Sequence, residues 1–446
     1  MTVNSSVSGS SVGGARSNAG LALALVALFV LLPYGVSFAL GEADPALVGW
    51  EAVQGRAASV FCEAGQNPTG VTMAVALGVL TVAWLAAQVW GDRLGVLGAT
   101  LKQEGFYMVV LVLAMSIPFF LAWGTDSSAC RRGVAFFWQT IFIDVYILSI
   151  LAVSYNLLFG FTGIVSFGHS AFFGMGAYMV GVFVNTFEWH WALAIVGALM
   201  VGLLIAVVKG VVGLRIKGLY FALFTLAFSE VFFLLAGNRL LTEITGAEDG
   251  FTFAVPAFLN ITTNRLFFYY MTLVLFVGAF LLVRLLMNSP TGQVLRGLRD
   301  NEERAQMLGY DTFRFKLLSI LISGFLATGA GVLRGIEIKG ANPAVLSTTY
   351  TFDPLLATII GGTATFTGPV LGTVGLHLLE EFLRNQVLTF GEITINIGER
   401  WALIMGVIFI IIVLAFPQGV VGTFMARRLN TLVGWKKLLR LERDTN

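Results

Sequence analysis

The chain has 446 residues, of which 57% are hydrophobic and 12% are charged, whereas ordinary soluble domains are about a quarter charged. Lys and Arg (27) nearly balance Asp and Glu (25), which gives no electrostatic reason to expect a nucleic-acid partner. Three histidines and two cysteines exclude Cys/His zinc modules, c-type haem attachment and a disulfide framework. With a mean hydropathy of +0.85, these values exclude a soluble enzyme, a DNA-binding protein and a secreted domain, and they indicate an all-α polytopic membrane protein.

The first apolar segment, 21–40, follows a polar leader that is rich in Ser and Gly and contains Arg16. A cleavable signal peptide is one interpretation, because Ser37-Phe38-Ala39 resembles a cleavage site. The apolar stretch is longer than a typical signal-peptide core, so we predict a first transmembrane span.

Further apolar segments recur along the whole chain, and most are long enough to cross a bilayer. Two shorter ones, 353–362 and 368–383, fit a broken, partly re-entrant hairpin, which brings the total to about twelve crossings. The composition changes near residue 134. We therefore predict a 1–133 extension with about three transmembrane helices, a core at 134–423 and a basic tail at 424–446. The other predicted spans are 71–90, 106–123, 134–158, 168–185, 192–212, 219–236, 266–287, 317–335 and 400–418.

Charged residues in the predicted loops indicate the orientation of the chain. Basic residues gather in alternate loops and in the tail, while acidic residues gather in the other loops, with Arg131 and Arg132 as an exception. Because short basic loops stay in the cytoplasm, both termini are predicted to be cytoplasmic and the 237–265 and 384–399 loops to lie outside.

On this map Cys62 and Cys130 both lie outside, where a disulfide persists. Two unpaired thiols are the other interpretation, because spacing alone does not show that the two residues approach each other.

The stretch 291–309 is charged, although it joins two apolar segments. Asp300 or Asn301 is a candidate cap for a short helix there. Leu298, Ala305 and Leu308 form an apolar stripe at helical spacing, and Gly309 is suited to end the helix. A protein partner would bury this stripe, and a lipid-surface helix or a solvated loop is the alternative.

Part of this stretch, Glu303-Arg-Ala305-Gln-Met-Leu-Gly309, resembles the Glu-x-Ala-x-x-x-Gly coupling motif of ABC importer permeases. The wider run is similar to its version in branched-chain amino acid (Liv-type) permeases, where this loop docks into a cytoplasmic ATPase. The resemblance implies ATPase-coupling roles for Arg296, Arg299, Asn301, Glu302, Glu303, Arg304, Ala305 and Gly309.

Other blocks resemble the same family. Residues 166–178 are similar to its Gly-His-x-x-Phe-x-Gly-x-Gly-Ala-Tyr signature, and 214–230 and 242–250 fit the blocks that follow. Residues 361–369 match its Gly-Gly-x-Gly-x-x-x-Gly-Pro turn except at Ala364, where the family usually has glycine, so the backbone of this turn stays open. The resemblance covers about 134–423, and the 1–133 extension is compatible with the longer M-type subunit.

The blocks supply candidates for the translocation path. Glycines in broken segments let backbone groups face a cavity, although small residues at helical spacing more often serve close helix packing. Charged residues at membrane depth are costly and are usually functional or paired. Glu230 is either a pore-facing group or a buried hydrogen-bonding partner, and for His169 a helix-end structural role is favoured over substrate contact. The candidates are His169, Gly174, Gly176, Tyr178, Glu230, Gly361, Gly362 and Gly368.

The remaining intramembrane charges have simpler interpretations. Asp144 and the pair Glu380 and Glu381 are expected close to the membrane interfaces. Lys209 and Arg284 are expected to extend their charged ends toward the cytoplasm.

The resemblance implies the ABC permease fold and a permease subunit of an ATP-driven importer for branched-chain or related amino acids. Implied partners are two ABC ATPases that hold ATP and Mg, a second homologous permease and a substrate-binding protein, in a prokaryotic cell membrane. This chain lacks a Gly-x-x-x-x-Gly-Lys-Ser/Thr loop, so no cofactor, metal or catalytic residue is predicted in it. The alternative is a secondary transporter or channel that uses Glu230 and Asp144 as ion sites.

Overall fold

The computed structural model describes part of the chain, which falls into two compact units. The described residues of Met1–Ile143 and Ala257–Gly278 belong to the first unit, and those of Asp144–Pro256 and Ala279–Asn446 to the second. Predictions for 21–40, 71–90, Cys62, Cys130 and the tail concern residues outside this part, as do those for most of 106–123. The described residues are 110–111, 113–115, 117–118, 134–216, 218–256, 259–262, 265–384, 387–390, 393–396, 398 and 400–423.

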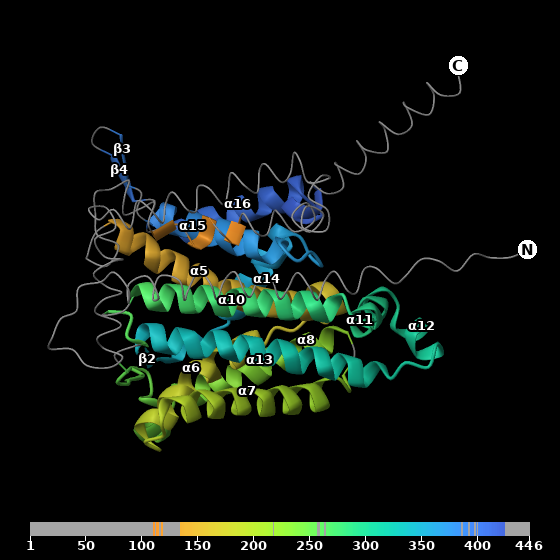
Figure 1. The fold of residues 1–446 in the computed structure, drawn as a ribbon. Helices are drawn as coiled ribbons and strands as arrows, with labels where there is room; N and C mark the ends of the chain where they lie inside the picture. Colours follow the sequence, from red (N-terminus) through yellow and green to blue (C-terminus); the bar gives the residue numbers. More distant parts are fainter. Residues whose placement is uncertain are drawn as a thin grey trace, which may run out of the picture. The chain divides into compact units, whose positions relative to one another are not determined.

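Helices dominate the described residues (Figure 1). The main ones are α5 (Val134–Asn156), which continues into a π-helix (Leu157–Thr162), α6 (His169–Asn185), α7 (Trp191–Gly213), α8 (Leu219–Ala236), α10 (Arg265–Met287), α11 (Pro290–Asp300), α12 (Glu302–Met307), α13 (Thr312–Ile338), α14 (Thr349–Gly361), α15 (Gly368–Arg384) and α16 (Trp401–Ala415). Short helices are α9 (Thr242–Thr245) and two 3-10 turns, Arg239–Leu241 and Pro343–Leu346.

Two small antiparallel ladders complete the described elements. Strand β1 (Phe251–Thr252) pairs with β2 (Gly340–Ala341), with Phe251 opposite Ala341. Strand β3 (Val387–Phe390) pairs with β4 (Ile393–Asn396).

Six helical segments in the described part are long and apolar enough to cross a membrane. This confirms the class of an all-helical membrane protein. Helices α6, α14 and α15 have 17, 13 and 17 residues, fewer than the ~20 needed for a straight crossing. The six segments are Phe136–Thr162, Trp191–Gly213, Leu219–Ala236, Arg265–Met287, Thr312–Ile338 and Trp401–Thr423.

In the first unit, two adjacent tyrosines of α10 hold the segment that contains residues 114 and 115. Tyr269 Oη donates to the carbonyl of Ala114 at 2.5 Å, and Tyr270 Oη donates to that of Met115 at 2.9 Å. Both hydroxyls thus find an acceptor in an apolar setting, which a buried tyrosine requires.

In the second unit, α6, α7 and α13 pack against one another along most of their lengths (Figure 1). Small residues permit the contact. A Cβ atom on Gly331 of α13 would lie 1.8 Å from the carbonyl oxygen of Phe173 in α6, and one on Gly176 would lie 2.2 Å from that of Thr328. Close backbone approach of α6 and α13 therefore forms the centre of this unit.

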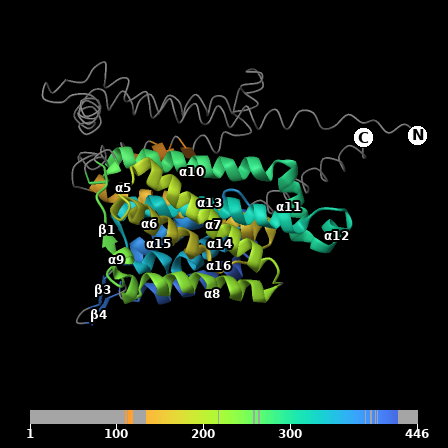
Figure 2. The same ribbon diagram turned by 90° about the horizontal axis from the view of Figure 1, so that it is seen from below.

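Helices α14 and α15 pack side by side, with α16 against both (Figure 2). The prediction that α14 begins at Asp353-Pro354 is wrong, because the helix starts at Thr349 and contains Pro354. The early start has a tertiary cause: the Thr351 hydroxyl accepts a hydrogen bond from the Ser170 N–H of α6 at 2.9 Å. The helix ends at Gly361, one residue before the end of the predicted 353–362 segment.

Candidate functional site

The predicted coupling stretch forms two helices, α11 and α12, that meet at Asn301. Ser289 caps α11, with Pro290 at its first position. Asn301 has an extended backbone and ends α11, while its side chain accepts from the Arg304 N–H at 2.9 Å and caps α12. Capping by Asn301 was one of the two predicted options, and the expectation of a single short helix is corrected.

The apolar stripe of this stretch is only partly buried. Leu298 and Ala305 are buried, as are Leu295 and Gly292 of α11, but Leu308 is 72% exposed. Leu308 follows the last residue of α12, so this end of the predicted stripe is not covered by the described part of the chain. Gly309 has φ +86°, a left-handed conformation that suits glycine, so the predicted stop is confirmed.

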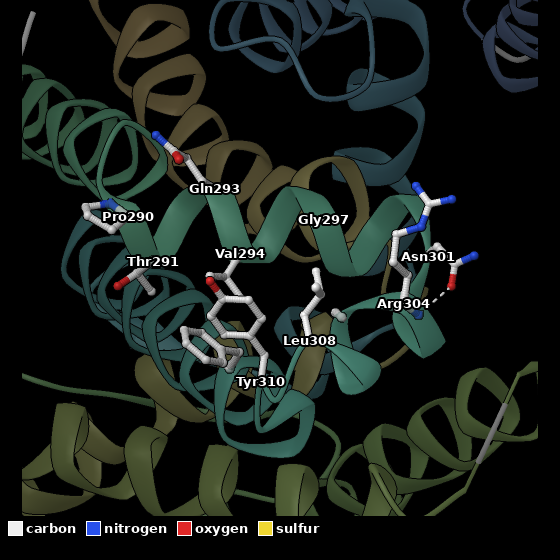
Figure 3. A pocket seen from close by; sticks show the side chains of 11 residues that line it. Pro290, Thr291, Gln293, Val294, Gly297, Asn301, Arg304, Leu308 and Tyr310 are labelled. Atoms are coloured by element: carbon white, nitrogen blue, oxygen red, sulfur yellow. Dashed lines mark hydrogen bonds between the residues drawn. The ribbon is translucent and has the colours of Figure 1, made fainter. Parts of the chain in front are cut away.

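A cleft of about 460 Å³ lies between α11, α12 and the beginning of α13. Figure 3 shows Tyr310 and Leu308 pointing into it from the turn after α12, opposite Val294 and Thr291 of α11. Glu302 lies next to this region and pairs with Lys316 of α13 at 2.6 Å, which ties α12 to α13. Glu303 and Arg304 are exposed.

Two arginines of α11 lie against the end of the α5 segment. The guanidinium of Arg296 is 5.7 Å from the centre of the Phe161 ring, within cation–π range. A Cβ atom on Gly163, which has φ +76°, would lie 3.1 Å from Cγ of Arg299. Arg296 and Arg299 are therefore in contact with residues 161–163, although both are exposed, as Glu303 and Arg304 are.

The turn between α14 and α15 is held by one side chain of α5. Asn156 Oδ1 accepts from the Ala364 N–H at 3.1 Å, and its Nδ2 donates to the carbonyl of Thr365 at 2.9 Å. Ala364 has φ +59°, so it adopts the left-handed conformation for which glycine is usual. Thr365 Oγ1 closes the turn by donating to Gly362 O and accepting from Gly368 N–H.

His169 is completely buried at the first position of α6. Its Nε2 lies 3.0 Å from Ser154 Oγ and 3.3 Å from Ser323 Oγ, which joins α5, α6 and α13. These contacts are those of a structural helix-end histidine, the role that the sequence favoured.

The glycine candidates lie at close contacts between elements. Gly174 faces Leu346, while Gly361 and Gly368 approach each other so closely that a Cβ on Gly361 would lie 1.7 Å from Gly368 O. Gly362 has φ +122°. Tyr178 is 2% exposed and packs its ring on Phe251.

Two charged residues inside predicted spans, Glu230 and Lys209, have different surroundings in the structure. Glu230 is half-buried, and the described part of the chain offers it no hydrogen bond or ion pair. The prediction for Lys209 is wrong: its Nζ is buried and donates to Gly168 O at 2.8 Å, 4.4 Å from the centre of the Phe172 ring. Bending of the chain before α6 brings this carbonyl within reach, so the ammonium group has a partner without leaving the core.

Asp144 lies in an ion triad, not alone at an interface. Arg334 Nη1 contacts Asp144 Oδ1 and donates to Glu337 Oε2 at 2.8 Å. In α15, Glu380 pairs with Arg384 at 2.6 Å. Since Arg334 already holds Asp144, an ion site at this carboxylate, as in a secondary transporter, has no support.

Comparison with known proteins identifies the family. Residues 137–414 match the family described as branched-chain amino acid transport system, permease component, which is more than half of the chain. The chain belongs to this family. Its members act as the permease component of an ABC system in which ATP hydrolysis resides in partner subunits.

Individual relatives of the chain are also permease proteins of branched-chain amino acid transport systems. The high-affinity branched-chain amino acid transport system permease protein LivM of Escherichia coli strain K12 is 25% identical over 348 residues, covering 72% of this chain and 76% of the relative. LivM of Salmonella typhimurium strain LT2 is 24% identical over 347 residues, with the same coverage. A probable LivM of Methanocaldococcus jannaschii is 25% identical over 313 residues, 61% of this chain and 89% of its own. No solved structure matches the permease.

Sequence reasoning missed three polar residues of the permease: Asn156, Arg334 and Glu337. Arg334 and Glu337 lie three positions apart on one face of α13, so their i, i+3 spacing inside an apolar segment was a usable signal. Asn156 had no such signal, because its partners lie 208 and 209 positions away.

Proposed function

We propose that the permease is the translocation subunit of an ATP-driven importer for Leu, Ile or Val. The name of its family and the names of its relatives support the substrate class. The observation that carries the coupling role is the α11–α12 segment: a polar helix pair whose buried Leu295 and Leu298 fix it to the helix core while its other face stays exposed. Such a segment receives a displacement from a soluble partner and passes it to the membrane helices.

The residues of this segment have different proposed roles: some contact the partner ATPase and others hold the two helices in place. Glu303, in the first turn of α12, complements the helix dipole and is placed to pair with a basic group of an ATPase. Arg304 is exposed beside it. Arg296 and Arg299 are exposed and also contact residues 161–163, Glu302 pairs with Lys316 of α13, and Asn301, Ala305 and Gly309 shape the two helices.

Two ATPases that hold ATP and Mg, a second homologous permease and a substrate-binding protein complete the proposed importer. This chain itself binds no cofactor in the proposal, has about twelve crossings and keeps both termini in the cytoplasm. ATP binding draws the ATPases together and displaces α11 and α12. Because the ATPases bind one state of the permease more tightly, the equilibrium between outward and inward access shifts.

The candidate path residues keep their proposed place near this change of access. In the proposal, the segments that rearrange are the short α6 and the α14–α15 pair, which contain His169, Gly174, Gly176, Tyr178, Gly361, Gly362 and Gly368. Most of these act as packing residues, and Glu230 of α8 is the one proposed to line the path.

The test uses charge reversal at the proposed docking surface. Glu303→Lys should lower co-purification of the ATPases and uptake into vesicles, Glu303→Gln should have a smaller effect, and Gly309→Val should act by misplacing the chain exit. A Cβ atom on Gly297 meets nothing within 4 Å, so Gly297→Ala is the matched glycine control. If Glu303→Lys and Gly309→Val both retain the ATPases and import at the parental rate, the docking role is wrong.

A further inference from the structure

We propose that Asn156, with the π-helix that follows it, is the positioning element that transmits movement of α11 to the turn between α14 and α15. The inference rests on the proposed coupling role of α11. It adds a route from that helix into the membrane part and assigns the central residue of the route.

The first step of the route joins α11 to residues 161–163. Arg296 lies over the Phe161 ring at 5.7 Å. The backbone of Gly163 is so close to Arg299 that a Cβ atom there would be 3.4 Å from Cα of Arg299. Displacement of α11 therefore presses directly on this short segment, because close-packed atoms transmit strain.

The second step joins the same segment to the turn. The Phe161 ring, 2% exposed, packs on the Phe366 ring with centroids 5.2 Å apart. A Cβ atom on Gly160 would lie 2.7 Å from the Ala364 nitrogen. The π-helix thus contacts both α11 and the 362–367 turn, and Phe161 takes part in both contacts.

Asn156 strengthens this second contact with two hydrogen bonds. Its side-chain amide donates to the Thr365 carbonyl and accepts from the Ala364 N–H, so it bonds to two consecutive residues of the turn. Asn156 is 2% exposed, so a lost bond is not replaced by bulk water. The two bonds make the turn follow the end of α5.

The π-helix is suited to move as a local unit. Its wider turn leaves the regular α-helical pattern, and single π-helical turns occur often at functional sites of helices. The Thr162 hydroxyl bonds back to Leu157 O at 2.8 Å, and the Ile164 N–H to Leu158 O at 2.9 Å. These bonds keep the segment together while its ends change direction.

The experiment measures the ratio of substrate imported to ATP hydrolysed, with the complete importer in proteoliposomes. Asn156→Leu leaves two partly buried backbone groups without their hydrogen-bond partner, so this ratio should fall about tenfold while the ATPases still co-purify and hydrolyse ATP. Ser149→Ala is the matched control, because Ser149 is also buried in α5 and its hydroxyl has no partner among the described residues. An unchanged ratio, or uptake and hydrolysis that fall in parallel, overturns the proposal. Loss of ATPase co-purification from the parental permease would instead defeat the coupling role itself.

Discussion

The ammonium group of Lys209 donates a hydrogen bond to the carbonyl of Gly168 at 2.8 Å, inside the helix core. The bond ties α7 to the residue that precedes α6. A single carbonyl and the face of Phe172 are the partners that offset the cost of burying this charge, because an unpaired charge at membrane depth is expensive.

Two replacements of Lys209 should separate the effect of its charge on stability from the effect of its side-chain volume. Lys209→Met keeps the long stem and removes the buried charge, so its free energy of unfolding should change by about 1 kcal/mol or less. Lys209→Glu places a carboxylate opposite a carbonyl oxygen and should abolish accumulation of the folded permease. Thermal unfolding measures the stability of Lys209→Met, and size-exclusion chromatography in detergent measures how much folded protein each variant yields. Equal loss of folded protein in the two variants would contradict the prediction.

The Asp144–Arg334–Glu337 triad predicts strong non-additivity. Arg334→Leu leaves two carboxylates without their cation and should lower the free energy of unfolding by about 3–5 kcal/mol. Adding Asp144→Asn and Glu337→Gln should recover most of this loss. Thermal unfolding measures the series. Arg384→Leu is the control: Arg384 is exposed and pairs with the partly buried Glu380, so its loss should cost about 1 kcal/mol or less. Absence of recovery would mean that the guanidinium has another essential role.

Glycines of the α14–α15 turn should respond to substitution according to their contacts. Gly361→Ala forces a Cβ against Gly368 O and should be destabilising by about 2 kcal/mol or more, whereas a Cβ on Gly375 meets nothing within 4 Å. Gly375→Ala should therefore be neutral or stabilising by about 0.5–1 kcal/mol. Thermal unfolding of the two variants is the measurement, and equal midpoints would contradict the close approach.

Glu230 should affect transport more than stability. Because it makes no hydrogen bond or ion pair within the described chain, Glu230→Gln should slow uptake while abundance and ATPase co-purification stay normal. Uptake of labelled leucine into vesicles is the measurement, with Glu243→Gln in the exposed 239–245 region as control. Unchanged uptake would remove Glu230 from the proposed path, and lost abundance would make it a buried structural residue.

Orientation can be tested with a single cysteine at position 300. Asp300→Cys, in a chain with Cys62→Ser and Cys130→Ser, should react with a membrane-impermeant thiol reagent only after cells are opened. A cysteine introduced at Glu243 should react in intact cells. Labelling of position 300 from outside would overturn the proposed topology.

Spans were predictable from sequence because apolar length decides them. The expected 219–236 segment coincides with α8, and 134–158 differs from α5 by two residues before the π-helix begins. The start of α14, the partner of Lys209 and the role of Asn156 were not predictable, since each depends on a group that is distant in sequence. In the coupling segment, the caps and the Gly309 stop followed local rules, whereas the burial of Leu298 and Ala305 without Leu308 depends on packing against other helices.

The contacts of Asn156 also set a delay during biosynthesis. The N–H that donates to it and the carbonyl that accepts from it lie in the turn, 208 and 209 residues further along the chain. At a synthesis rate of roughly 5–20 residues per second, α5 waits about 10–40 seconds after its own translation before the turn exists. Throughout this interval the amide of Asn156 has to be accommodated by water or by the insertion machinery, so α5 is a helix whose last turn matures only near the end of translation.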